Sequence, residues 1–120
     1  MSRILVVEDT PNNMKLAVLL LEKSGHEALQ AIDAEEGIRI AQERQPDLIL
    51  MDVQLPGMDG LTATRLLKSD PQTRSIKIIA VTALAMAGDQ EKIGAAGCDG
   101  YIAKPLRYKE FLKVVTETLG

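Results

Sequence analysis

The stretch LILMDVQLPGMDG, residues 48–60, passes from a wholly apolar segment through the carboxylate of Asp52 into a loop punctuated by proline and glycine. Four apolar residues bounded by turn signals predict a strand that is buried on both faces, and such strands occur in parallel sheets covered by helices. The carboxyl end of a parallel strand lies at the sheet edge where open α/β folds bind ligands. Asp52 is therefore the first candidate functional residue.

Strand signals of the same kind recur along the chain. Short runs rich in apolar residues predict four more strands, at residues 4–7, 27–32, 76–82 and 99–103. Helical segments follow each strand, and this alternation predicts an α/β fold with a parallel sheet and right-handed crossovers. We expect a flavodoxin-like (βα)5 domain with the strand order 2-1-3-4-5, in which the weakly patterned segment 27–32 forms an edge strand.

Local signals define the helices. Thr10 before Pro11 is typical of an N-cap followed by the first helical residue, with the threonine oxygen accepting a backbone N–H. Asp33 and Glu36 resemble a capping box at the start of the second helix. Five residues at helical spacing predict the inner face of a closing helix: Tyr108, Phe111, Leu112, Val115 and Leu119.

Composition excludes several classes of protein. The 120 residues are 46% hydrophobic and 26% charged, which predicts one folded domain over residues 1–120 and no output domain. A net charge of -3 argues against nucleic-acid binding. The sequence contains no apolar run of membrane-helix length and no signal peptide pattern, and its lone Cys98 cannot form an internal disulfide. We therefore expect a cytoplasmic protein without membrane contact.

The ends of the predicted strands form a second pattern. Glu8 and Asp9 follow the first strand, Asp52 ends the third, Thr82 ends the fourth, and Lys104 follows the fifth. Parallel strands bring these residues to one edge of the sheet, where each close pair of carboxylates costs about 4 kcal/mol at an effective dielectric of 20. Oxygen ligands without histidine or cysteine suit a hard cation, and a site with room for water and phosphate suits Mg²⁺ better than Ca²⁺.

Lys104 adds a second positive charge to this edge, and Thr82 adds a hydroxyl. Carboxylates, Mg²⁺, a lysine and a hydroxyl are the parts that stabilise a transferring phosphoryl group, with Asp52 available as the nucleophile. Together with Tyr101 and the Lys104–Pro105 step, these motifs resemble the receiver domain of two-component response regulators over the whole chain. The segments at 9–15 and 83–89 are similar to stand-alone cell-division regulators of the DivK type and to receivers attached to hybrid kinases.

The resemblance implies a role for each matching residue. Asp52 would accept a phosphoryl group from a partner's phosphohistidine, while Lys104 and Thr82 would each contact a phosphoryl oxygen. The Lys104–Pro105 peptide would be cis. The resemblance further implies that Mg²⁺, for which Mn²⁺ could substitute, is held by four groups: Glu8, Asp9, Asp52 and the backbone carbonyl of Gln54.

The resemblance also implies a switch. Movement of the Thr82 hydroxyl toward the phosphate would vacate space for the ring of Tyr101, which would alter the face formed by helix 88–96, strand 99–103 and the closing helix. The implied partners are a histidine kinase or histidine phosphotransfer protein and a downstream protein on this face, and the chain itself would be a monomer or weak dimer. The apolar segment 83–87 is either ordinary packing or a partner-docking patch.

Three alternatives share some of these features. A haloacid-dehalogenase-like phosphatase also uses an aspartyl phosphate and Mg²⁺, but that family has a second aspartate where this chain has Gln54. A flavodoxin requires a phosphate-binding loop after the first strand, where this chain has two acids. A receiver excised from a hybrid kinase would share the whole site. We expect a phosphorylation-controlled binding protein rather than an enzyme that acts on a diffusible substrate.

Overall fold

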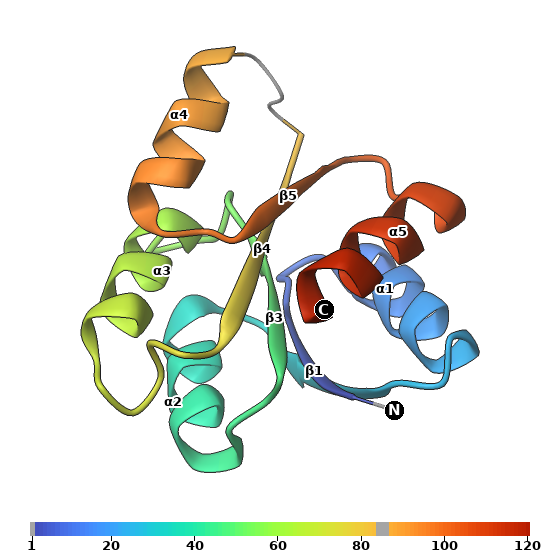
Figure 1. Cartoon of the computed structure of the whole chain (residues 1–120), viewed down its shortest axis with the longest axis horizontal. Coiled ribbons are helices and arrows are strands. Elements are labelled where there is room, and N and C mark those ends of the chain that lie inside the picture. Colours follow the sequence, from blue (N-terminus) through green and yellow to red (C-terminus); the bar gives the residue numbers. More distant parts are fainter. Residues whose placement is uncertain (1, 84–86) are drawn as a thin grey trace.

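The computed structural model describes residues 2–83 and 87–120, which form a five-stranded parallel sheet between two helical layers (Figure 1). The strands are β1 (Arg3–Val7), β2 (Glu27–Ala31), β3 (Leu48–Asp52), β4 (Lys77–Thr82) and β5 (Gly100–Ala103). Their order is β2-β1-β3-β4-β5, and every neighbouring pair is parallel. The predicted flavodoxin-like topology is confirmed, including the edge position of β2.

Helices cover both faces of the sheet. They are α1 (Pro11–Lys23), α2 (Ala34–Arg44), α3 (Gly60–Ser69), α4 (Ala87–Ala96) and α5 (Tyr108–Leu119). Figure 1 shows α1 and α5 on one side of the sheet and α2, α3 and α4 on the other. Among the residues that the structure describes, none of the helices is long and apolar enough to cross a membrane.

Strand β3 lies at the centre of the sheet, and all of its residues are buried. Successive side chains of a strand point to opposite faces. Leu48 and Leu50 accordingly pack in the core cluster under α1 and α5, whereas Ile49 and Met51 pack in the cluster under α2 and α3. The prediction of a strand buried on both faces is therefore confirmed.

Two local predictions are confirmed only in part. Thr10 is the N-cap of α1, but its side chain accepts no capping hydrogen bond. The backbone N–H of Thr10 donates to Glu8 Oε2 at 3.1 Å. Tyr108 does not line the inner face of α5. It lies in the first turn, exposed, and its ring centroid is 5.0 Å from the ammonium of Lys23, so the ring contacts the end of α1 rather than the sheet.

Other local predictions are confirmed. Asp33 accepts a hydrogen bond from the Glu36 backbone N–H at 2.8 Å, and the Glu36 carboxylate accepts one from the Ile32 backbone N–H at 3.0 Å. The reciprocal bond of this capping box thus falls one residue before the N-cap. The Lys104–Pro105 peptide is cis. Most of the apolar segment 83–87, for which two roles were open, lies outside the described residues.

Candidate functional site

Three carboxylates meet at the carboxyl edge of the sheet. Glu8 and Asp9 follow β1, Asp52 is the last residue of β3, and these two strands are neighbours. One oxygen atom from each carboxylate lies within 4.8 Å of the other two. Glu8 is only 5% exposed and Asp52 only 3%, whereas Asp9 faces solvent. The topology therefore concentrates negative charge in a place that is largely shielded from water.

Lys104 brings a positive charge to the same place. Its Nζ lies 3.0 Å from Asp52 Oδ2 and 3.3 Å from Glu8 Oε1, although the lysine follows β5, two strands away from β3. When all three carboxyl groups are ionised, the single ammonium leaves two negative charges uncompensated. A divalent cation would balance them.

The shared burial changes the acidity of two of these groups. Burial raises the pKa of Glu8 above its ordinary value, and the neighbouring Asp52 carboxylate raises it further. Burial also disfavours the charged form of Lys104, but its pairing with Asp52 and Glu8 outweighs this, so that the pKa of Lys104 is raised. The site therefore contains a firmly protonated lysine and one carboxyl group that resists ionisation.

The Asp52 carboxylate is held through both of its oxygens. Oδ2 accepts from Lys104, and Oδ1 accepts a hydrogen bond from the Gln54 backbone N–H at 3.0 Å. The Gln54 side chain is exposed, so this residue contributes to the site through its backbone. Together the two contacts fix the orientation of the carboxylate before any ligand arrives.

The two predicted switch residues occupy different parts of the sheet. Thr82 ends β4, is 1% exposed, and follows Val81, the residue that pairs with Asp52 in the sheet register. Tyr101 lies on the edge strand β5 and is 39% exposed. Thr82 is thus at the carboxyl edge with the acids, while Tyr101 is on the lateral edge of the sheet.

The donor set fits Mg²⁺. It consists of carboxylate oxygens without imidazole or thiolate, which is the chemistry that hard cations prefer. Two of the carboxylates are already desolvated, and the site retains excess negative charge. Glu8, Asp9 and Asp52 would hold the ion.

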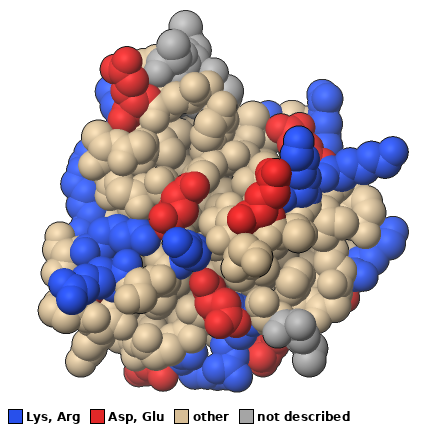
Figure 2. All heavy atoms as spheres, viewed as in Figure 1, with Lys and Arg blue, Asp and Glu red and all other residues tan. Residues whose placement is uncertain are grey.

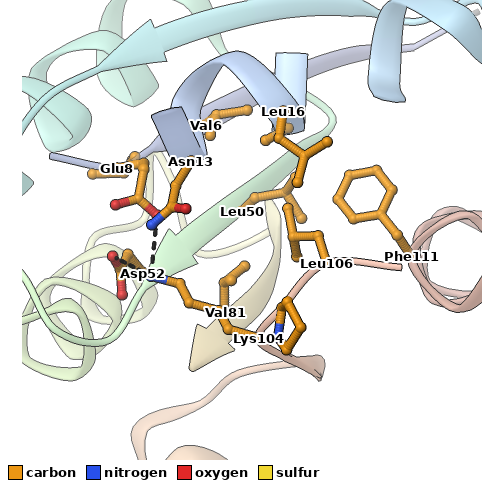
Figure 3. A pocket seen from close by; sticks show the side chains of 13 residues that line it. Val6, Glu8, Asn13, Leu16, Leu50, Asp52, Val81, Lys104, Leu106 and Phe111 are labelled. Carbon is orange, nitrogen blue, oxygen red and sulfur yellow. Dashed lines mark hydrogen bonds and ion pairs between the residues drawn. The ribbon is translucent and has the colours of Figure 1, made fainter. Parts of the chain in front are cut away.

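A cavity that the sequence did not predict opens beside the acidic cluster. It has a volume of about 310 Å³ and reaches from the cluster into the space between α1 and the segment after β5. In Figure 3, Glu8, Asp52 and Lys104 lie toward one end, and Leu16, Leu106 and Phe111 toward the other. Leu16, a large apolar residue on α1, lines this cavity and is partly exposed to solvent.

Glu8→Gln is expected to change stability and metal affinity in opposite directions. The folded chain holds a proton on Glu8 more tightly than the unfolded chain does, so ionised Glu8 costs stability once the pH rises above its raised pKa. A neutral glutamine removes this cost, and the metal-free variant should be more stable than the natural protein. Mg²⁺ loses an anionic ligand and should bind more weakly. Thermal unfolding without metal and calorimetric titration with Mg²⁺ measure the two quantities.

The pH dependence provides a further check on Glu8. In the natural protein, the stability contributed by this group should fall as the pH rises through the raised pKa, while Mg²⁺ affinity rises because protons compete less. Glu8→Gln should weaken both dependences. Glu22→Gln, a change on the exposed surface of α1, should alter neither. A metal-free Glu8→Gln protein less stable than the natural one would contradict the interpretation.

Figure 2 shows acidic and basic side chains on the same face of the molecule, with several of the basic side chains gathered toward its left side. Nucleic-acid binding surfaces carry a continuous basic patch or stripe. The net charge of -3, and not the face in view, is the argument against nucleic-acid binding by this chain.

Comparisons with known proteins identify the family. Residues 4–116 match the response regulator receiver domain. The chain is 45% identical over 117 residues to the polar-differentiation response regulator DivK of Brucella anthropi, a match that covers 98% of this chain and 95% of that protein.

Solved structures agree with this match. The receiver domain of the sensor histidine kinase PA1611 from Pseudomonas aeruginosa PAO1, which has a magnesium ion coordinated in its active site cleft, is 35% identical with a TM-score of 0.92, covering 99% of this chain and 98% of that one. A putative response regulator from Chloroflexus aurantiacus J-10-fl is 29% identical with a TM-score of 0.94, covering 98% and 97%.

The family match spans the whole acidic site, from Glu8 to Lys104. It favours neither the phosphatase nor the flavodoxin alternative. The carboxylate cluster of this chain is compatible with the kind of metal bound by the Pseudomonas receiver domain. The chain belongs to the family of response regulator receiver domains, and within that family it is similar to DivK.

Proposed function

We propose that Asp52 is the phosphoacceptor of this receiver domain and that its phosphorylation controls protein binding. The observation that carries the proposal is the geometry around Asp52: a buried carboxylate, oriented by a lysine and a backbone N–H, beside two further carboxylates suited to a divalent cation. The donor would be the phosphohistidine of a histidine kinase or a histidine phosphotransfer protein.

The transfer requires little covalent chemistry from the protein. An Asp52 oxygen attacks phosphorus, the N–P bond of the phosphohistidine breaks, and the imidazole nitrogen leaves with the electron pair and is neutralised by a proton from solvent. Glu8, Asp9 and the Gln54 carbonyl would help Asp52 to hold the metal, which can be Mg²⁺ or Mn²⁺. Bound metal offsets the charge on the phosphoryl oxygens. Lys104 Nζ is already 3.0 Å from Asp52 Oδ2 and would pair with one of the phosphoryl oxygens.

Because the phosphoryl group ends on the protein itself, the chain would act as a substrate of its partner and not as an enzyme with a diffusible substrate. Hydrolysis of its own acyl phosphate would return it to the resting state. Incubation with acetyl phosphate and Mg²⁺, followed by mass spectrometry of peptides, tests this assignment. The label is expected on the peptide that contains Asp52, and a label confined to other peptides would overturn the proposal.

The output would pass through the face formed by α4, β5 and α5. Thr82 ends β4, the strand next to the one that ends in Asp52. Tyr101 lies on β5, the exposed edge strand that pairs with β4, so a displacement of the Thr82 side chain can be transmitted to Tyr101 through these two strands. Phosphorylation needs a differential interaction of a few kcal/mol to reverse the populations of two such states. A downstream protein would recognise this face, as part of signalling of the polar-differentiation kind for which DivK is named.

The cavity beside Asp52 suits docking of the phosphodonor. The cavity shares Glu8, Asp52 and Lys104 with the phosphorylation site. A partner protein that inserts an apolar side chain into the cavity would therefore lie against Asp52. Leu16 lines this cavity and is 38% exposed, which makes it accessible to a partner. We infer that the phosphodonor inserts an apolar side chain here.

Leu16→Asp is expected to slow phosphorylation by a protein donor about tenfold or more, since a charge would line an apolar contact. Labelling by acetyl phosphate should continue at the natural rate, because this small donor needs no docking surface. The measurement compares the two donors, using a phosphotransfer protein that labels the natural chain.

The matched control for this prediction is Leu19→Asp. Leu19 lies on the same helix and is 61% exposed, but it does not line the cavity. The Leu19→Asp variant should be labelled by the protein donor and by acetyl phosphate at rates near those of the natural protein. An equal loss with both donors would show that Leu16→Asp disturbs the site itself, and no loss with either would remove the cavity from the docking surface.

A further inference from the structure

We propose that Gly60 is a positioning residue for the phosphoacceptor, acting through the backbone of Asp52; this rests on the proposed function. Gly60 is the first residue of α3 and is buried. A Cβ atom placed on it would overlap the Asp52 carbonyl oxygen and would lie 2.8 Å from the Asp52 carbonyl carbon. Real Cβ atoms essentially never approach this closely, so the helix start and the strand end touch through a space that only glycine leaves open.

The requirement is for space and not for an unusual backbone conformation. Gly57, in the same loop, has a φ of 73°, whereas Gly60 is not among the residues with positive φ. A side chain at position 60 would therefore be tolerated by the local backbone but excluded by Asp52.

Hydrogen bonds prevent Gly60 from moving away. Its backbone N–H donates to the carbonyl of Val53 at 3.0 Å, and the Val53 N–H donates to the carbonyl of Val81 on β4, also at 3.0 Å. On the helix side, Asp59 caps α3 by accepting from the Thr62 N–H at 2.8 Å. The start of α3 is thus fixed to the segment immediately after Asp52.

This contact determines how the site is oriented. The Asp52 carbonyl belongs to the peptide that leads to Val53 and Gln54, and the Gln54 N–H holds the Asp52 carboxylate at 3.0 Å. A helix start that presses on this carbonyl must rotate the peptide or push the strand end. Either movement misplaces the carboxylate and the Gln54 carbonyl together.

Gly60→Ala tests the inference. The variant is expected to fold with reduced thermal stability and to bind Mg²⁺ about tenfold more weakly, a typical cost of disturbing a group that orients metal ligands. Its rate of labelling by acetyl phosphate should fall about 100-fold, as expected for a displacement of about 1 Å at a reacting group. Calorimetric Mg²⁺ titration and backbone amide spectra of residues 52–54 give readouts that do not depend on phosphorylation.

Two control variants separate positioning from loss of stability. Gly94→Ala makes the same change in α4, where a Cβ meets nothing within 4 Å, and it should preserve Mg²⁺ affinity. Val115→Ala opens a cavity in the core under α5 and should lower stability without changing Mg²⁺ affinity. A folded Gly60→Ala protein that matches the natural protein in Mg²⁺ affinity and labelling would overturn the inference.

A second variant covers the case in which Gly60→Ala does not fold. Asp59→Ala removes the exposed cap and loosens the start of α3 without adding an atom beside Asp52. It should weaken Mg²⁺ binding by less than Gly60→Ala is expected to, and unchanged binding would count against the inference. If the natural protein is not labelled at Asp52, the proposed function fails, while the Mg²⁺ comparison still decides the role of Gly60.

Discussion

Asp52→Ala is expected to abolish Mg²⁺-dependent phosphorylation, whether the donor is a histidine kinase or acetyl phosphate. The side chain would supply the attacking oxygen, and its two oxygens are oriented by Lys104 and the Gln54 N–H. Glu8 and Asp9 are the remaining carboxylates of the cluster, but Asp9 is exposed and Glu8 has a raised pKa, so neither is prepared to replace Asp52. The phosphorylated fraction, measured by intact-mass spectrometry, should drop to background.

The control for this experiment lies at the other end of the same strand. Asp47 precedes β3, is exposed, and accepts a hydrogen bond from the Arg3 backbone N–H at 2.8 Å, far from the carboxyl edge. Asp47→Ala should be labelled as efficiently as the natural protein. Undiminished labelling of the Asp52→Ala variant would contradict the assignment of Asp52 as the phosphoacceptor.

Lys104→Met is expected to destabilise the metal-free protein by about 3 kcal/mol, because it leaves two buried carboxylates without their cation. Methionine keeps most of the length and apolar surface of the side chain, so the change reports mainly on charge. Mg²⁺ should restore much of the lost stability, since it brings positive charge to the same carboxylates. Unfolding by denaturant with and without Mg²⁺ measures both effects.

Lys113→Met provides the matched control, because Lys113 is exposed on α5. It should be nearly neutral and should respond to Mg²⁺ as the natural protein does. If Mg²⁺ stabilises the Lys104→Met protein no more than it stabilises the control, the lysine and the metal do not act on the same charges.

The sequence predicts the sheet and its site well because both depend on strong local signals. Apolar runs that end in Asp52 or Glu8 define strands and mark their carboxyl ends, and parallel pairing then requires those ends to meet. The position of Lys104 beside them follows from the same rule, although its 3.0 Å contact with Asp52 depends on a side chain that crosses an intervening strand.

Features that depend on packing between distant segments could not be predicted in this way. Tyr108 has the spacing of a core residue, yet it lies at the start of α5 and contacts Lys23 instead. The cavity beside Asp52 is lined by α1, α5, three strands and the segment after β5, and no single stretch of sequence encodes its shape. The exclusion of a side chain at Gly60 likewise depends on a contact with Asp52 that only the folded chain creates.

The dispersal of the site along the chain has a consequence for biosynthesis. Glu8, Asp52 and Lys104 lie at the carboxyl ends of three different strands, and the ion pair between Asp52 and Lys104 joins residues 52 positions apart. Contacts of such sequence separation form late in folding, because the loop entropy must be overcome first. If Asp52 is the phosphoacceptor, a nascent or partly folded chain would lack the complete site for phosphorylation. Competence for phosphorylation would then come with completion of the fold, and incompletely folded copies would not compete for the donor.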